Sequence, residues 1–245
     1  MTLQGKRVLI TGGGSGLGAD LARGFAGAGA QVLIAGRRAD ALARVAALHG
    51  ARTVQADVTD EGSLRAMFAA AGPCDIVIAN AGVADSGLLQ RTTLDQWNAM
   101  IAVNLTGTFL TLREGLIQMP GWGRLIAIAS TAGLRGYAKV APYAAAKHGV
   151  VGLVRSLALE VARKPVTVNA LCPGFLDTEM TERSIAVIVE KTGRTPEAAR
   201  AVLESASPQN RLIAPAEVTA AALWLCGPGS DGVNGQAIAI SGGDP

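Results

Sequence analysis

The chain has 245 residues, of which 49% are hydrophobic and 17% are charged, and its formal net charge is +3. This composition predicts a globular protein with a large core and excludes a disordered chain. Since the basic residues form no long run, we expect neither a nucleic-acid partner nor a membrane partner.

Seven short apolar runs alternate with segments of helical length along the chain. The predicted strands are Arg7–Thr11, Gln31–Gly36, Arg52–Ala56, Asp75–Ala79, Arg124–Ser130, Val166–Cys172 and Gln236–Ile240. The predicted helices are Leu17–Gly29, Ala39–His49, Glu61–Ala71, Thr93–Gln118, Pro142–Arg163 and Pro215–Cys226. Strands that alternate with helices predict an α/β fold with a parallel sheet. Because no Gly/Ser-rich or Pro-rich linker divides residues 1–245, we expect a single domain.

The long segment 175–214 breaks this alternation. It follows the sixth predicted strand and mixes apolar residues with charged ones such as Arg183, Lys191 and Arg194. Long excursions in compact domains are usually lids or binding loops, and ligands bind beyond the carboxyl ends of parallel strands. We therefore expect residues 175–214 to form a substrate lid or loop.

The first predicted strand runs into a glycine-rich turn, Thr11-Gly12-Gly13-Gly14-Ser15-Gly16-Leu17-Gly18, and then into an Ala-rich helix. Glycines let a pyrophosphate approach the backbone closely, and a helix amino terminus presents free N–H groups. Between a strand and a helix, this spacing favours dinucleotide binding over an ordinary tight turn. The residues expected to bind the cofactor here are Gly12, Ser15, Gly16, Leu17 and Gly18.

The second predicted strand ends in Gly36-Arg37-Arg38, where a site for NAD would present a carboxylate to the adenosine ribose. Two guanidinium groups instead favour the 2′-phosphate of NADP(H), through charge-assisted hydrogen bonds. The alternative is a pair of solvated arginines, so NAD(H) stays possible.

Two further turns are expected to contact the cofactor. Asp57 and Val58, after the third predicted strand, would flank the adenine. Asn80-Ala81-Gly82 closes the fourth predicted strand with small residues, and would lie under the cofactor.

Ser130 ends the fifth predicted strand, and Tyr143 and Lys147 follow at the start of a predicted helix. Residues four apart share a helix face, so the Lys147 ammonium is expected to lower the pKa of the Tyr143 phenol. Such a phenol can exchange a proton with an alcohol or a ketone, while Ser130 holds the substrate oxygen. The alternative is one packed ring and one solvated charge, because short motifs also occur by chance.

Cysteine and histidine are too sparse for a metal centre. Cys74, Cys172 and Cys226 are widely separated in apolar surroundings, which predicts buried free thiols, and only His49 and His148 accompany them. We therefore expect no metal site. The amino end enters an apolar strand without a long hydrophobic stretch, so we expect a cytoplasmic protein.

With these motifs in order, the chain resembles the short-chain dehydrogenase/reductase family over essentially its whole length. The motif positions are Thr11, Gly12, Gly16, Gly18, Asn80, Ala81, Gly82, Asn104, Ser130, Tyr143, Lys147, Pro173 and Gly174. The resemblance implies a Rossmann-type doubly wound domain with seven parallel strands flanked by helices.

The resemblance also implies roles for the site residues. Tyr143 would be the general acid in ketone reduction and the base in alcohol oxidation, Lys147 would bind the nicotinamide ribose as well, and Ser130 would polarise the carbonyl. Asn104 would support a water-linked proton relay to Lys147, although it could equally satisfy backbone groups. The residues that would contact the nicotinamide are Pro173, Gly174, Phe175 and Thr178.

The expected substrate wall is mostly apolar and consists of Thr131, Ala132, Leu134, Tyr137, Val140, Phe175, Leu176 and Met180. A neutral ketone or an acyl chain suits such a wall better than a sugar. Together with the basic residues of segment 175–214, the stretches 171–175 and 238–243 are similar to family members that reduce 3-oxoacyl thioesters of CoA or acyl-carrier protein. We therefore predict a 3-oxoacyl-thioester reductase.

Two alternatives stay open. One is an NAD(P)-dependent secondary-alcohol dehydrogenase for a cyclic, aromatic or short hydroxy-acid substrate, where a carboxylate would need Arg135 or Lys139 turned inward. The other is a non-catalytic regulator that senses the dinucleotide, against which the intact Ser130, Tyr143 and Lys147 speak. Members of the family pair long helices across two-fold axes, so we expect a homotetramer.

Overall fold

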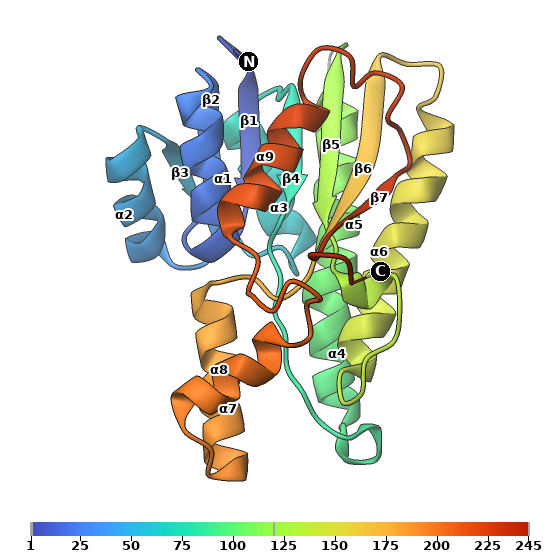
Figure 1. Cartoon of the computed structure of the whole chain (residues 1–245). Coiled ribbons are helices and arrows are strands. Elements are labelled where there is room, and N and C mark those ends of the chain that lie inside the picture. Colours follow the sequence, from blue (N-terminus) through green and yellow to red (C-terminus); the bar gives the residue numbers. More distant parts are fainter. Residues whose placement is uncertain (1, 120, 245) are drawn as a thin grey trace.

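The computed structural model describes residues 2–119 and 121–244 of the chain. Seven strands form one parallel sheet in the order β3-β2-β1-β4-β5-β6-β7 (Figure 1). They are β1 (Arg7–Thr11), β2 (Gln31–Gly36), β3 (Arg52–Gln55), β4 (Ile76–Ala79), β5 (Gly123–Ile128), β6 (Val166–Pro173) and β7 (Ala237–Ile240). The order reverses between β1 and β4, and open parallel sheets bind ligands beyond the carboxyl ends of the strands at such a point.

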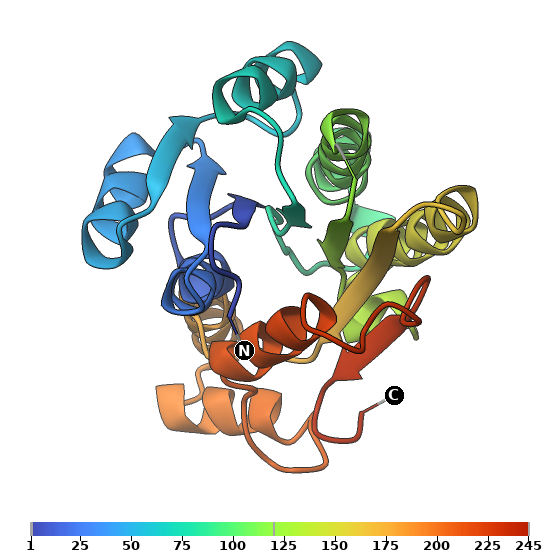
Figure 2. The ribbon, with the colours of Figure 1, turned by 90° about the horizontal axis from the view of Figure 1, so that it is seen from above.

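Helices cover both faces of this sheet (Figure 2). One face carries α1 (Gly16–Gly27), α2 (Ala39–His49) and α9 (Pro215–Leu225), and the other carries α3 (Glu61–Ala71), α5 (Gly107–Gln118) and α6 (Ala141–Glu160). Each face has its own apolar core, with Phe25 buried in the first and Phe68 in the second. The prediction of a doubly wound α/β fold is confirmed.

The predicted strands agree with the observed ones to within two residues at each end. In β4, β5 and β6 every residue is buried. Strands covered on both faces have continuous apolar runs, and this pattern made them recognisable in the sequence.

The prediction of one long helix over Thr93–Gln118 is confirmed, but a π-helical turn that was not predicted lies in its middle. The segment consists of α4 (Leu94–Ile101), a π-helical turn (Ala102–Thr106) and α5. In the turn, Asn104 Nδ2 donates to the Met100 carbonyl at 3.1 Å, and Thr108 Oγ1 donates to the Asn104 carbonyl at 2.8 Å. Side chains that occupy helical carbonyl groups in this way accompany local widening of a helix.

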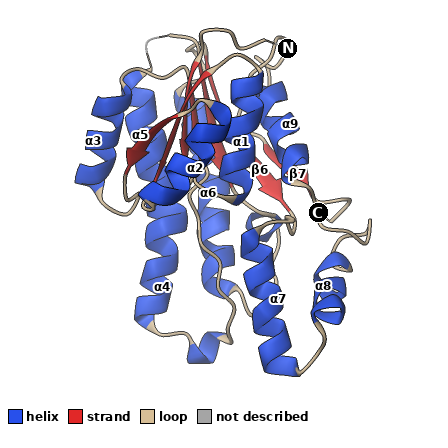
Figure 3. Cartoon of the chain, turned by 90° about the vertical axis from the view of Figure 1, so that its left-hand side faces the viewer, coloured by secondary structure: helices blue, strands red, loops and turns tan. Residues whose placement is uncertain are grey.

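Segment 175–214 contains two helices that were not predicted, α7 (Glu179–Thr192) and α8 (Pro196–Glu204). They extend beyond the sheet, on the same side as α4 (Figure 3). Arg200 of α8 joins them, because it pairs with Asp177 at 2.9 Å, with Glu182 at 2.8 Å and with Glu204 at 3.1 Å. Their place at the carboxyl ends of the strands suits a lid, and that role stays a prediction.

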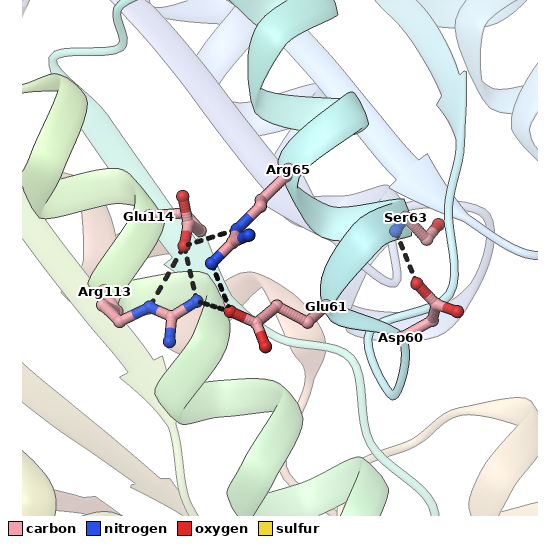
Figure 4. A network of polar contacts seen from close by, with 6 residues as sticks. All are labelled: Asp60, Glu61, Ser63, Arg65, Arg113 and Glu114. Atoms are coloured by element: carbon pink, nitrogen blue, oxygen red, sulfur yellow. Dashed lines mark hydrogen bonds and ion pairs between the residues drawn. The ribbon is translucent and has the colours of Figure 1, made fainter.

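A network of charged side chains joins α3 to α5 (Figure 4). Glu61 Oε1 accepts hydrogen bonds from Arg65 and from Arg113, both at 2.7 Å. Arg113 also donates to Glu114 at 2.6 Å. These contacts hold the first turn of α3, and so the end of the loop that leads from β3, against α5.

Within residues 2–119 and 121–244, none of the helices combines the length and the apolar character that a membrane crossing requires. Cys74, Cys172 and Cys226 are buried and free, as predicted.

At the amino ends of the strands, the Arg124 guanidinium of β5 is buried, with 2% of the residue exposed. It donates to the Leu225 carbonyl at 3.1 Å and to the Gly123 carbonyl at 2.9 Å, and it pairs with Asp231 at 2.5 Å. It also lies 4.2 Å from the centroid of the Trp122 ring. Arg124 therefore links β5, the end of α9 and the loop that leads to β7.

We expect Arg124→Met to lower the free energy of unfolding by about 2–3 kcal/mol, because the carbonyl groups of Gly123 and Leu225 lose a charged donor and Leu225 keeps only its bond from Ser230. The matched control is Arg44→Met, since Arg44 forms an exposed pair with Asp40 one helical turn away. Urea unfolding followed by circular dichroism measures both, and equal losses in the two variants would contradict the role given to Arg124.

Candidate active site

The turn after β1 has no room for side chains at Gly12, Gly13 and Gly18. A Cβ on Gly18 would lie 2.1 Å from the Gly12 carbonyl oxygen, and a Cβ on Gly13 would lie 2.5 Å from the Ile34 Cβ. Gly12 and Gly16 have φ angles of +68° and +51°, which other residues rarely adopt. The turn therefore presents backbone and the start of α1, which is the surface that a pyrophosphate needs.

Two side chains hold this turn in place. Asn80 Nδ2 donates to the Thr11 carbonyl at 2.9 Å and to the Gly12 carbonyl at 3.3 Å. Thr11 Oγ1 accepts from the N–H groups of Asn80 and Ala81, at 3.1 Å and 3.2 Å. The Asn80 side chain thus contributes to the predicted cofactor site by fixing the glycine turn.

The start of α1 is flanked by side chains on two sides. Ser15 precedes α1 and its side chain does not cap the helix, while Leu17 is buried and anchors the first turn. Arg38 donates to Ser15 Oγ at 3.3 Å, which places its guanidinium beside the turn. On the other side, a Cβ on Gly16 would lie 3.5 Å from the Thr178 side chain. The glycine cradle and its neighbours therefore fit a dinucleotide.

Arg37, Asp57 and Val58 lie at the carboxyl ends of β2 and β3. Hydrogen bonds from Thr59 and the nearby Arg37 charge lower the pKa of the Asp57 carboxyl. Val58 packs against Gly107, where a Cβ would lie 2.8 Å from Val58 Cγ2. An exposed cation, an anion and an apolar side chain thus gather where the adenosine was predicted to bind.

Ser130 follows β5 and begins a 3-10 turn, Thr131–Gly133. Its Oγ accepts a hydrogen bond from the Ala132 N–H at 3.1 Å. A Cβ on Gly133 would lie 2.7 Å from the Lys147 carbonyl oxygen, so the turn packs directly against α6. This close contact brings Ser130 to the part of α6 that carries Tyr143 and Lys147.

The Lys147 side chain is buried beside Tyr143. Its Nζ donates to the Ile128 carbonyl at 2.8 Å and lies 5.6 Å from the centroid of the Tyr143 ring. Burial lowers the pKa of Lys147 to about 8. Burial also raises the pKa of the Tyr143 phenol, against the smaller opposite effect of its hydrogen bond with Ser130.

The expected lowering of the Tyr143 pKa by Lys147 is therefore wrong for the protein alone. Burial disfavours the charged form of both groups, and it is the largest cause of both pKa shifts. At neutral pH the site holds a protonated phenol next to an ammonium group.

Asn104 lies under the same site, in the π-helical turn. Its Oδ1 accepts from the Val83 N–H at 3.2 Å, and its Nδ2 donates to the Val83 carbonyl at 2.9 Å. A Cβ on Gly82 would lie 2.9 Å from Asn104 Oδ1 and 3.8 Å from Lys147 Nζ, so both side chains approach this glycine. Asn104 satisfies backbone groups, as the alternative interpretation held, and it also lies near Lys147.

The predicted substrate side surrounds the end of β6. The Gly174 N–H, after Pro173, donates to the Ile240 carbonyl at 3.0 Å, and the Phe175 carbonyl accepts from the Ile213 N–H at 2.8 Å. Thr131 and Ala132 are buried, whereas Phe175 and Met180 expose much of their side chains. The half-buried members of the predicted wall are Leu134, Tyr137, Val140 and Leu176.

Sequence reasoning missed three contributions to the site: the Ile128 carbonyl, the close approach at Gly133, and Asp244, which bonds to Tyr137 and pairs with Arg135. The glycine three residues after Ser130 was a usable signal for a tight turn. Asp244 gave no local signal, because it lies 107 residues from Tyr137.

Comparison with known proteins agrees with this geometry. The sequence profile of the short chain dehydrogenases matches residues 6–187. The chain belongs to the short-chain dehydrogenase family. D-beta-hydroxybutyrate dehydrogenase of Rhizobium meliloti is 35% identical, over 97% of this chain and 98% of that protein. The 3-oxoacyl-acyl-carrier-protein reductase FabG of Aquifex aeolicus is 34% identical, over 98% of each.

Among solved structures, one of an actinorhodin polyketide ketoreductase variant with NADPH superposes with a TM-score of 0.91. It is 32% identical, and the match covers 99% of this chain and 98% of that chain. As a short-chain dehydrogenase, the protein is an NAD(P)-dependent oxidoreductase that interconverts a ketone and a secondary alcohol.

We expect Gly18→Ala to raise the Kd for NADPH at least about tenfold, because the new Cβ would displace the Gly12 carbonyl and the turn. Gly27→Ala in the same helix is the matched control, since a Cβ there meets nothing within 4 Å. Isothermal titration calorimetry measures both, and unchanged affinity in the Gly18→Ala variant would show that the turn does not hold the nucleotide.

We expect Lys147→Met to raise the free energy of unfolding at pH 7 by about 2 kcal/mol, because a buried cation is removed and only one hydrogen bond is lost. Between pH 8 and pH 10.5 the unfolded chain binds the Lys147 proton and the folded chain does not. The wild type therefore gains stability as the pH rises through this window, and the advantage of the variant shrinks.

Unfolding of the nucleotide-free protein in urea at pH 7 and pH 9.5 measures this difference. Lys139→Met, at an exposed position, is the control. If the Lys147→Met variant were less stable than the wild type at pH 7, burial of the Lys147 ammonium group would not lower the free energy of unfolding, which would contradict this expectation.

Proposed function

We propose that the protein uses NADPH to reduce the keto group of a 3-oxoacyl thioester to a hydroxyl group. The convergence of Ser130, Tyr143 and Lys147 at the carboxyl end of β5, beside a mostly apolar wall, carries the proposal. The relatives named as a 3-oxoacyl-acyl-carrier-protein reductase and a polyketide ketoreductase support this substrate class.

In the proposed reaction, Ser130 and Tyr143 hold the ketone oxygen, and Tyr143 donates the proton that completes the alcohol. Its raised pKa keeps the phenol protonated at neutral pH, as an acid requires. Lys147, with a pKa of about 8, is mainly charged at pH 7 and favours the phenolate that remains. Asn104 holds the backbone after β4 in position beneath Lys147. A bound nicotinamide dinucleotide supplies the hydride for reduction or accepts it in oxidation.

The preference for NADPH is proposed from the end of β2. Arg37 and Arg38 follow this strand, and both are exposed. Arg38 already reaches Ser15, so its guanidinium lies where a 2′-phosphate beside the glycine turn can be bound. The residues that would hold the dinucleotide are Gly12, Ser15, Gly16, Gly18, Arg37, Arg38, Asp57, Val58, Gly82, Lys147, Pro173, Gly174, Phe175 and Thr178.

Oxidation of a short hydroxy acid is the second candidate, favoured by the similarity to D-beta-hydroxybutyrate dehydrogenase. A free carboxylate in the site needs a cation as its partner. Arg135, which would supply it, is already paired with Asp244. We therefore prefer the thioester, which carries no charge next to the keto group.

The proposal includes a homotetramer and a cytoplasmic location. α5, α6 and α9 each expose a large apolar side chain, Ile117 at 69%, Leu159 at 80% and Trp224 at 50%. Helix faces of this kind suit contacts between copies of the chain. Free buried cysteines suit a reducing compartment. Light scattering that found only monomers would contradict the tetramer.

The test measures initial rates with acetoacetyl-CoA, acetoacetate and plain cyclic or aryl ketones, each with NADPH and with NADH. We expect the fastest turnover for acetoacetyl-CoA with NADPH. Arg38→Gln should raise the KM for NADPH about tenfold and leave the KM for NADH unchanged. Turnover limited to plain ketones would contradict the thioester substrate, and turnover limited to NADH would contradict the preference for NADPH.

Tyr143→Phe is the matched variant for the chemistry. Loss of the proton donor should lower kcat by at least about 100-fold, while the Kd for NADPH stays within twofold of the wild-type value. A wild-type protein that binds NADPH and turns over none of the ketones would favour the regulator that senses the dinucleotide.

A further inference from the structure

The Asp244 carboxylate is a buried charge at the edge of the substrate site. Asp244 follows β7, and it lines a small cavity together with Thr131 and Phe175. Thr131 directly follows Ser130, and Phe175 follows the Pro173-Gly174 turn. The carboxylate therefore lies on the side of the site where the substrate, rather than the nucleotide, is proposed to bind.

Two donors from a single loop bind this carboxylate, and one of them is a cation. The Tyr137 hydroxyl donates to Asp244 Oδ2, and the Arg135 guanidinium pairs with Oδ1. Arg135 also stacks on the Tyr137 ring, 4.6 Å from its centroid. Figure 1 shows the C-terminal end of the described chain beside this loop, which leads into α6.

Backbone contacts hold Asp244 in place. The Ser241 hydroxyl donates to the Asp244 carbonyl, and the Ser207 hydroxyl donates to the Ser241 carbonyl at 3.1 Å. The carboxylate is thus presented by an ordered turn that joins β7 to the end of segment 175–214. An ion pair built in this way persists without a substrate and competes with any substrate carboxylate for Arg135.

We propose that Asp244 determines specificity, because it occupies Arg135 and so excludes substrates that carry a free carboxylate one methylene away from the keto group. A 3-oxoacyl thioester has an uncharged thioester group at this place and needs no cation there. This inference deepens the proposed thioester reduction and rests on it for the identity of the preferred substrate.

Asp244→Asn removes the charge and keeps an oxygen that can accept from Tyr137. Arg135, which is half exposed and bound to the residue that lines the cavity, then loses its carboxylate partner. We expect the Kd for acetoacetate, measured by calorimetry with NADP⁺ present to prevent turnover, to fall about tenfold. The ratio of kcat/KM for acetoacetate to that for acetoacetyl-CoA should rise about tenfold with NADPH.

The matched control is the double variant Asp244→Asn with Arg135→Gln, which lacks both charges. It should return the Kd and the ratio to within about twofold of the wild-type values. Unchanged acetoacetate binding in the single variant, or an equal gain in the double variant, would overturn the role of Asp244. A gain that Lys139→Gln rather than Arg135→Gln abolishes would also overturn it.

The proposed thioester reduction and the proposed role of Asp244 can be contradicted independently of each other. Wild-type protein without activity on acetoacetyl-CoA would contradict the proposed function. The calorimetric comparison of the single and double variants does not need turnover, so it still decides whether Asp244 blocks a carboxylate site. Thermal unfolding of each variant checks that the fold is retained.

Discussion

The geometry of the active site depends on the contact between α6 and the turn that follows β5. Gly133 allows this turn to touch the Lys147 backbone, and the Lys147 ammonium group donates a hydrogen bond to the last carbonyl of β5. A strand and a helix are therefore joined at two points within one helical turn of Tyr143. Ser130 and Tyr143 are held by rigid elements, with little freedom to separate, which is what proton transfer between fixed groups requires.

Two buried cations have opposite roles in this fold. Arg124 lies at the amino ends of the strands, where two carbonyl groups, one carboxylate and an indole ring compensate its burial. Lys147 lies at the carboxyl ends of the strands and has a single carbonyl acceptor. Because this one hydrogen bond does not offset the loss of water around the ammonium group, the pKa of Lys147 is lowered. The stabilising charge and the reactive charge are thus at opposite ends of the same sheet. Proteins commonly accept such a local loss of stability where chemistry takes place.

The sequence was sufficient for elements and motifs whose signals are local. Buried strands such as β5 show continuous apolar runs, and the glycine turn and Ser130 lie at the ends of strands that were located to within two residues. Tyr143 and Lys147 lie in α6, whose start was predicted to within one residue. The π-helical turn could not be predicted, because Asn104 has no distinctive signal in a helical sequence. Its hydrogen bond to the Val83 carbonyl becomes visible only in the structure. α7 was hidden by its mixed composition, and its apolar face packs against α8 and Leu212. The partners of Asp244 and the burial that sets the pKa of Tyr143 depend on residues distant in the chain.

The Arg200 contacts give the two halves of the site different sensitivities to ionic strength. One guanidinium holds Asp177, Glu182 and Glu204, and all of these groups are partly exposed, so dissolved ions screen their attraction. The nucleotide side is shaped by close contacts between uncharged backbone groups at Gly12 and Gly18, which dissolved ions do not weaken. Changes in salt therefore act on how α7 and α8 are held together within segment 175–214, while the glycine cradle keeps its shape. The ionic strength of the surroundings can thus alter the proposed substrate side of the crevice without disturbing the nucleotide side.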